Sequence, residues 1–260
     1  MPANEDHIRI FETENPTVIF STPPVLTRLI RSGLMTEKNL IRLWYVSGSP
    51  INTNDAIAME GKLKKGIVMQ ACSRAESNVP FMSNLDDPLE KRIFTVGYPP
   101  KKKITRIVDG ELQIKKNYII PMLFNEHEFT KDEWYSTGDL IEVDSDGYYI
   151  FKGRKKLLIN YGPKDVNPLE VEDIVDSLED IEKSYCVGIE LKEDPHTKYL
   201  CLAIDGKNIK KDELKVFLQK TLNLAFYDIF LMKDFPMTDS GKINRIELTK
   251  RIQNIIDNNY

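Results

Sequence analysis

The stretch WYSTGDLIEVDSDGYYIFKGRKK, residues 134–156, predicts two short β-strands joined by a polar turn at 144–147. Folding at that turn would bring the carboxylate of Asp139 close to the guanidinium of Arg154. A carboxylate offers two hydrogen-bond acceptors and a guanidinium offers a planar fork of donors, so together they could bind a vicinal diol such as a ribose. The alternative is an ordinary hairpin with a weak surface ion pair, and this stretch alone favours that plainer interpretation.

The residues before this hairpin alternate between predicted strands and helices. A strand, a helix, a strand, a helix and a strand are expected in turn, at 17–21, from 23, at 43–46, at 53–65 and at 67–69. This order is typical of a parallel sheet, whose ligands bind beyond the carboxyl ends of the strands. Ser47-Gly48-Ser49 and residues 70–76 follow two of those ends, where they form either a ligand site or ordinary connecting loops.

From about residue 85 the pattern changes to short antiparallel strands, with a hairpin expected on Asp109-Gly110. Segments expected to join this hairpin in a small barrel or sheet lie at 92–96, 118–124 and 139–151. A third region follows Arg154, with helices expected from 167, at 211–222 and at 244–257, and strands at 184–191, 199–204 and 228–232. The sequence therefore predicts an α/β plus α+β chain: a partial parallel α/β subdomain at 1–84, an antiparallel β-rich subdomain at 85–153 and an α+β domain at 154–260.

Composition excludes several classes of function. The chain has 260 residues with 36 basic and 40 acidic side chains, and this balance gives no long-range attraction to nucleic acid or to anionic membranes. The three cysteines, Cys72, Cys186 and Cys201, follow no metal-binding spacing and indicate a reducing compartment. We find neither a signal-peptide core nor an apolar run long enough to span a membrane, so a cytoplasmic location is expected.

Four runs of sequence, taken together, carry a resemblance to a known superfamily. In chain order they are VMQACSRAES (68–77), WYSTGDL (134–140), GRKKLLINYGPKDVNPLEVE (153–172) and PMTDSGKINR (236–245). They resemble the adenylate-forming superfamily of acyl-CoA synthetases, luciferases and peptide-synthetase adenylation domains. The run at 153–172 is most similar to fatty-acyl-CoA ligases. The resemblance begins near residue 16 and covers the C-terminal half of a typical member.

The resemblance implies that ATP and Mg²⁺ activate a small carboxylic acid as an acyl-adenylate, which then passes to the thiol of coenzyme A. Asp139 and Arg154 would hold the ribose of the nucleotide. Lys242 would lie between the carboxylate of the acid and the α-phosphate, where it would stabilise charge in the transition state and orient two reactants that repel each other. Without the other motifs, Lys242 would be interpreted as a solvated lysine in a Ser-Gly turn.

The resemblance also implies roles for three further segments. Ser47-Gly48-Ser49 would pass the adenine, and Glu76 would help to hold Mg²⁺ through oxygen ligation. Lys156 matches the hinge position, with the hinge at 154–156, about which a mobile C-terminal domain would swing between adenylation and thioester formation. The simpler alternative for Lys156 is a charged surface lysine.

Several positions depart from the family pattern. Cys72 stands where an aromatic residue faces the adenine, Arg74 and Ala75 lie near the phosphate-contacting threonine, and Pro163 replaces a glycine. The 260 residues contain no counterpart of the Ser/Thr/Gly-rich phosphate loop, of the remaining strands of the N-terminal sheet or of much of the acyl pocket. We therefore expect a truncated chain that adenylates no acid alone, and that is poorly soluble or dimerises through an exposed sheet edge.

Three interpretations stay open. The first is an AMP-forming acyl-CoA ligase of fatty-acid metabolism, and the second is a non-catalytic remnant of that family. The third is an interaction module whose partner is a separately made N-terminal half or a second copy of the chain. Within the enzyme class, the alternative is an adenylation domain that loads a carrier protein. The retained Lys242, Asp139 and Arg154 favour descent from a working enzyme.

Overall fold

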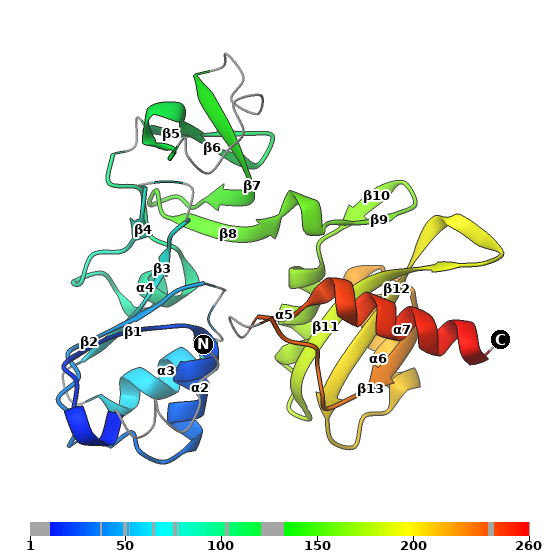
Figure 1. Cartoon of the computed structure of the whole chain (residues 1–260), viewed down its shortest axis with the longest axis horizontal. Helices are drawn as coiled ribbons and strands as arrows, with labels where there is room; N and C mark the ends of the chain where they lie inside the picture. Colours follow the sequence, from blue (N-terminus) through cyan, green and yellow to red (C-terminus); the bar gives the residue numbers. More distant parts are fainter. Residues whose placement is uncertain are drawn as a thin grey trace. The chain divides into compact units, whose positions relative to one another are not determined.

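The computed structural model describes residues 11–36, 38–48, 51, 53–63, 66–74, 77, 79–101, 104–120, 133–238 and 242–259. The chain divides into two compact units, which we call the first unit, Met1–Lys152, and the second unit, Gly153–Tyr260 (Figure 1). The residues at 121–132 lie outside the described part, and with them most of the strand expected at 118–124. Among the described residues, no helix combines the length and apolar character that crossing a membrane requires.

A four-stranded sheet forms one part of the first unit, in the order β1-β2-β3-β4. Its strands are β1 (Val18–Ser21), β2 (Leu43–Val46), β3 (Ile67–Cys72) and β4 (Phe81–Met82), and the pairs β1·β2 and β2·β3 are parallel as predicted. The helices are α2 (Pro23–Arg31), α3 (Thr53–Lys62) and α4 (Leu89–Phe94). The fully buried Trp44 belongs to their core, and its indole N–H donates to Ser21 Oγ at 2.8 Å.

The expectation of a strand at 92–96 is wrong, because most of that segment is helix α4. Arg92 explains the helix: its guanidinium is buried and donates to both carboxylate oxygens of Glu60, at 2.7 and 2.6 Å, and to the carbonyl oxygen of Val68 at 2.8 Å. Burying a guanidinium is tolerated when its donors are satisfied in this way. The contact ties α4 to α3 and to β3.

The second sheet of the first unit is antiparallel, in the order β5-β6-β7-β8. Its strands are β5 (Thr105–Val108), β6 (Glu111–Lys115), β7 (Trp134–Val143) and β8 (Tyr149–Arg154), with the 3₁₀ turn η2 (Lys116–Tyr118) after β6. Gly153 and Arg154, the last residues of β8, already belong to the second unit. The predicted turn at Asp109-Gly110 is confirmed: both residues have positive φ angles, 50° and 77°, as a tight hairpin turn requires. Leu112, Ile114 and Ile141 form the core of this part.

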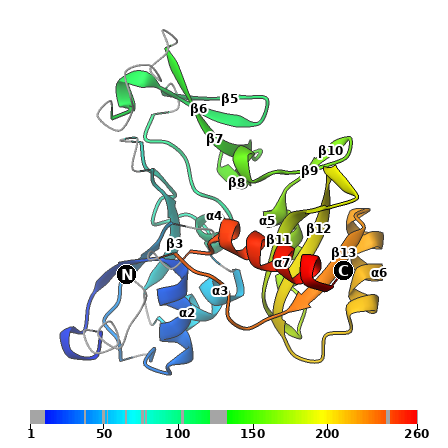
Figure 2. The ribbon, with the colours of Figure 1, turned by 45° about the vertical axis from the view of Figure 1, so that its right-hand side comes forward.

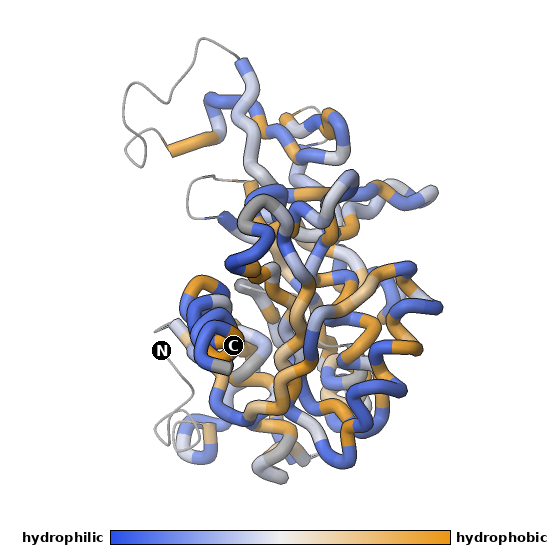
Figure 3. Tube along the Cα trace, turned by 90° about the vertical axis from the view of Figure 1, so that its right-hand side faces the viewer, coloured by the Kyte–Doolittle hydropathy of each residue, from blue (hydrophilic) through white to orange (hydrophobic). Residues whose placement is uncertain are grey.

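The second unit is a three-layered α+β domain (Figures 1 and 2). Its elements are η4 (Lys155–Leu157), β9 (Ile159–Tyr161), β10 (Lys164–Val166), α5 (Pro168–Asp176), β11 (Ile181–Leu191), β12 (Asp194–Gly206), α6 (Lys211–Leu222), β13 (Phe226–Leu231) and α7 (Arg245–Asn259). The main sheet has the order β11-β12-β13. Successive side chains of β12 point to opposite faces, so Leu200 and Leu202 pack with α5 and α6 while Cys201 and Ala203 pack with α7. Both faces are therefore covered, which explains the nearly continuous hydrophobic run at 199–204 of β12. Figure 3 shows the hydropathy of each described residue along the chain.

Candidate active site

Asp139 lies in a β-bulge of β7. Glu111 pairs with Leu140 and Gln113 pairs with Ser136, so three residues of β7 oppose the single residue Leu112 of β6. Within this bulge Gly138 has a positive φ of 73°, its N–H donates to the carboxylate of Glu111 at 2.9 Å, and the N–H of Asp139 donates to Thr137 Oγ1 at 3.1 Å. Bulges change the direction in which side chains point, and the side chain of Asp139 in this bulge is only 2% exposed. Thr137, Gly138 and Asp139 thus each have a structural role: the first two form the bulge and the third is buried by it.

Arg74 is the main charged contact of Asp139, and sequence reasoning assigned it no role. Its guanidinium donates to Asp139 Oδ2 through Nη1 and to the carbonyl oxygen of Thr137 through Nη2, the latter at 2.7 Å. The side chains of Arg74 and Asp139 are 4% and 2% exposed, so this is a buried ion pair. A charged residue directly after a parallel strand is the signal that could have indicated it. The predicted proximity of Asp139 and Arg154 stays a prediction, because Arg154 belongs to the second unit.

Ser47 and Gly48 follow β2, and Arg74 follows β3. Because β2 and β3 are parallel neighbours, these residues lie at the same carboxyl edge of the sheet. Ser47 is buried and its N–H donates to the carbonyl oxygen of Ser21 at 3.0 Å, while Gly48 has a positive φ of 99°. Ligands of such sheets bind at this edge. Ser49 and Glu76 lie outside the described residues.

Arg154 and Lys156 lie where the chain enters the second unit. Arg154 ends β8 and is half-buried, and the exposed Lys156 lies in the short 3₁₀ turn η4. Gly153 has a φ of 135°, and a Cβ built there would lie 2.9 Å from Oδ1 of Asn167. Only glycine fits this position without strain. The role of Lys156 as a hinge residue stays a prediction.

Lys242 lies between β13 and α7. Its carbonyl oxygen accepts from the N–H of Thr238 at 2.7 Å, and its own N–H donates to Thr238 Oγ1 at 3.2 Å. Met237 forms a β-bridge with Ile243, and the N–H of Asn244 donates to the carbonyl oxygen of Pro236 at 2.8 Å. The backbone of Lys242 is thus held on both sides while its side chain is exposed.

Within the described part of the chain, no group of three or more His, Cys, Asp or Glu side chains is arranged to hold a metal ion. Glu76, the predicted magnesium ligand, is among the residues that the structure does not describe. The magnesium prediction therefore rests on the sequence alone.

Comparisons with known proteins show which enzymes this chain is similar to. No family model matches the sequence. A medium-chain acyl-CoA ligase named ACSF2, mitochondrial, from Rattus norvegicus is 25% identical over 267 residues, which cover 92% of this chain and 43% of the relative. A 2-succinylbenzoate–CoA ligase from Staphylococcus epidermidis is 29% identical over 194 residues, 68% of this chain and 40% of the relative. The ATP-bound MatB structure from Rhodopseudomonas palustris matches with a TM-score of 0.79 at 21% identity, covering 96% of this chain and 53% of that chain.

The homologues of this chain are thus acyl-CoA ligases, and its fold is that of the C-terminal half of adenylate-forming enzymes. The predicted resemblance and the predicted fold class are both confirmed. The chain spans less than half the length of the curated relatives that it matches.

Proposed function

We propose that this chain is part of an AMP-forming acyl-CoA ligase, in which it binds the nucleotide and helps to join it to a small carboxylic acid. Homology to acyl-CoA ligases supports the reaction class. The observation that carries the proposal is the bulge at 137–139, which keeps the carboxylate of Asp139 nearly buried against Arg74, which follows β3 at the carboxyl edge of the parallel sheet. A carboxylate accepts hydrogen bonds through both oxygens, and the two hydroxyls of a ribose are suitable donors.

The remaining nucleotide contacts follow from the predicted roles. Ser47, Gly48 and Ser49 lie against the adenine, and the positive φ of Gly48 is consistent with close approach of backbone to a ligand. Arg154 holds the ribose together with Asp139. Glu76 would supply a carboxylate oxygen to Mg²⁺, whose charge would offset that of the phosphates.

Lys242 assists the first chemical step. A carboxylate oxygen of the acid attacks the α-phosphorus of ATP, a new O–P bond forms, and the electron pair of the broken bond leaves with pyrophosphate. The ammonium of Lys242 lies between the two negative reactants. Two unit charges about 4 Å apart attract by about 4 kcal/mol at an effective dielectric constant of about 20, so one well-placed ammonium offsets much of the repulsion.

The second step passes the acyl group to a thiol. The sulfur of coenzyme A attacks the acyl carbon, the thiol proton is released, and AMP leaves with the electron pair of the cleaved C–O bond. Rotation about residues 154–156, with Lys156 as the hinge residue, would exchange Lys242 for the thiol at the reaction centre. A fatty acid is the proposed substrate, because the run at 153–172 is most similar to fatty-acyl-CoA ligases.

A non-catalytic member of the family is the second candidate, and Arg74 is the observation that favours it. Its guanidinium already donates to Asp139 and to the carbonyl oxygen of Thr137. A ribose therefore has to displace or share an internal cation before it binds Asp139. In a non-catalytic chain this ion pair would persist and the nucleotide would not bind.

Pyrophosphate exchange tests the proposal. In the presence of a panel of carboxylic acids, we expect the polypeptide purified from its own cells to exchange labelled pyrophosphate into ATP. Lys242→Ala should reduce the rate about 10²–10³-fold, the range measured for other transition-state donors. Exchange that is unaffected by Lys242→Ala would overturn the assignment. Offering coenzyme A and a carrier protein as acceptors then separates a ligase from a carrier-loading domain, and the 260 residues alone are expected to give no exchange.

A further inference from the structure

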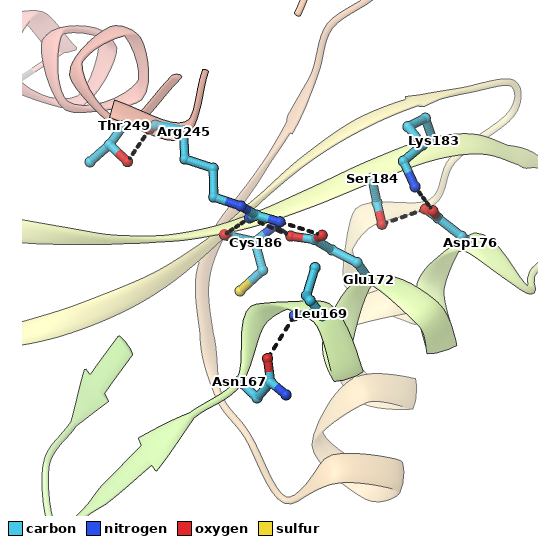
Figure 4. A network of polar contacts seen from close by, with 9 residues as sticks. All are labelled: Asn167, Leu169, Glu172, Asp176, Lys183, Ser184, Cys186, Arg245 and Thr249. Atoms are coloured by element: carbon cyan, nitrogen blue, oxygen red, sulfur yellow. Dashed lines mark hydrogen bonds and ion pairs between the residues drawn. The ribbon is translucent and has the colours of Figure 1, made fainter. Parts of the chain in front are cut away.

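Arg245 is the first residue of α7 and follows Lys242 by three positions. Its guanidinium donates to both carboxylate oxygens of Glu172 on α5, at 2.7 Å each (Figure 4). Its Nη1 also donates to the carbonyl oxygen of Cys186 on β11, at 3.1 Å. A bidentate arginine–carboxylate pair is among the most geometrically specific contacts that proteins make. The start of α7 is therefore tied to a second helix and to the sheet.

The pair also satisfies the backbone N–H and carbonyl groups of Cys186 at the outer edge of the sheet. β11 is an edge strand, and the N–H of Cys186 donates to Glu172 Oε1 at 2.7 Å while its carbonyl oxygen accepts from Arg245. An edge strand presents such groups to solvent unless something covers them. Here two side chains take the place of a neighbouring strand. Moving Arg245 would thus break contacts of the backbone as well as the ion pair.

The environment of the pair is closed. The side chain of Glu172 is 5% exposed and that of Arg245 is 16% exposed. Glu172 occupies the buried stripe of α5 with Pro168, Val171 and Val175, a position where a carboxylate is unfavourable without a partner. Burial raises the pKa of Glu172, and its hydrogen bonds with Arg245 and Cys186 oppose that shift. The pair is therefore a fixed point rather than a solvated contact.

Lys242 is close to this fixed point along the chain. Three residues span at most about 11 Å, so the backbone of Lys242 cannot lie farther than that from Arg245. Between the two, Asn244 caps α7 by accepting the N–H of Glu247 at 3.1 Å, and its own N–H donates to the carbonyl oxygen of Pro236. The segment 242–245, which we call the Lys242 loop, is thus held at one end by Thr238 and at the other by Glu172.

The N-terminal end of α5 lies beside the residues where the chain enters the second unit. Asn167 caps α5 by accepting the N–H of Leu169 at 3.2 Å, and the backbone of Gly153 lies against the same asparagine side chain. One short helix therefore connects the residues where the chain enters the unit with the anchor of the Lys242 loop. This arrangement fixes Lys242 relative to the entry point.

We propose that Glu172 and Arg245 are positioning residues that hold the Lys242 loop in one place relative to α5. The inference rests on the proposed function of Lys242, but its structural part does not depend on activity. Neither residue touches the reacting atoms in this scheme. They act by restricting where the exposed ammonium of Lys242 is presented.

Amide hydrogen exchange tests the structural part on the 260-residue chain. Glu172→Gln is expected to raise the exchange rates of the Lys242 and Asn244 amides at least tenfold, because Arg245 loses its carboxylate. Asp176→Asn is the matched control: it weakens another contact of α5 with β11, the hydrogen bond of 2.7 Å from Ser184, without touching α7. It should change those two amides less than twofold. Equal effects of the two variants would overturn the proposal.

A second variant covers the case in which Glu172→Gln does not fold. The double variant Glu172→Met/Arg245→Met leaves no buried charge without a partner, and such replacements are often tolerated. It should fold, and the Lys242 and Asn244 amides should still exchange at least tenfold faster. Unchanged protection of these amides in a folded double variant would contradict the proposal.

Pyrophosphate exchange separates this inference from the proposed function. In the active polypeptide, Glu172→Gln should lower the exchange rate at least tenfold while AMP affinity changes less than twofold. In a Lys242→Ala background it should have no further effect. Additive losses would mean a general structural defect and would refute positioning. If Lys242→Ala alone has no effect, the proposed function fails, and the amide measurement still decides whether the loop is anchored.

Discussion

Replacing Arg74 with methionine gives the sharpest test of how Asp139 is held. The two side chains are 4% and 2% exposed, so the variant leaves the Asp139 carboxylate in a protein interior without the guanidinium. Removing one partner of a buried ion pair costs about 3–5 kcal/mol. For a folding unit of roughly 150 residues, 1 kcal/mol corresponds to about 2–4 °C in Tm, so we expect Tm to fall by roughly 10 °C.

Urea and thermal unfolding, followed by circular dichroism, measure this loss. Arg106→Met is the matched control, because Arg106 is an exposed arginine whose contacts are Gln113 at 2.7 Å and the ring of Trp134. It should cost less than about 1 kcal/mol. The double variant Arg74→Met/Asp139→Asn should recover most of the stability lost by Arg74→Met. Equal small losses for Arg74→Met and Arg106→Met would refute the buried ion pair.

The same variant has the opposite effect on nucleotide binding in our account. Because Arg74 occupies Oδ2 of Asp139, a ribose competes with it. Arg74→Met should therefore bind AMP at least as tightly as the unmodified chain, although it is less stable. Titration calorimetry below the unfolding temperature measures this affinity. Loss of AMP binding in a folded Arg74→Met variant would mean that Arg74 contacts the nucleotide directly.

Two further predictions concern other parts of the chain. Burial raises the pKa of Cys201 to about 12 and that of Cys186 well above its usual range, so both thiols stay protonated at pH 8. Mass spectrometry should find that iodoacetamide modifies the half-buried Cys72 faster than either of them. Equal rates of modification would contradict the packing of β11 and β12. Gly153→Ala places a Cβ 2.9 Å from Asn167 at a φ of 135°, so it should lower the free energy of unfolding in urea by about 1–3 kcal/mol. Gly61→Ala in α3 is the control, because the space around Gly61 is open. It should leave that free energy unchanged or raise it by up to about 1 kcal/mol.

Local patterns predicted most of the elements. The turn at Asp109-Gly110 follows from residues that tolerate positive φ, and α5 begins at the predicted Asn167-Pro168, where Asn167 caps the helix. These signals lie within a few residues of the structure that they specify. The parallel pairing of the first three strands could be predicted as well, because strands and helices alternate along this part of the chain.

The contacts that shape the candidate site could not be predicted, because they join distant residues. Arg74 and Asp139 are 65 positions apart, and Glu172 and Arg245 are 73 apart. The sequence predicts a strand where helix α4 forms, because the buried contact of Arg92 with Glu60, 32 positions earlier, leaves no mark in the local pattern. Two of these residues carry a local signal: Arg74 is a charged residue after a parallel strand, and Glu172 is a carboxylate in the apolar stripe of a helix. The assignments of Ser49, Glu76 and Lys156 stay predictions.

Binding of ribose-modified nucleotides tests the central claim, that Asp139 is the ribose acceptor of a nucleotide site. AMP and 3′-deoxy-AMP are titrated into the 260-residue chain and into its Asp139→Asn variant. A hydrogen bond to a charged group contributes about 1.5–3 kcal/mol, so we predict that removing the 3′-hydroxyl weakens binding at least tenfold in the unmodified chain. In Asp139→Asn the two nucleotides should differ much less. An equal preference for AMP in both proteins, or no nucleotide binding by the folded chain, would contradict the account.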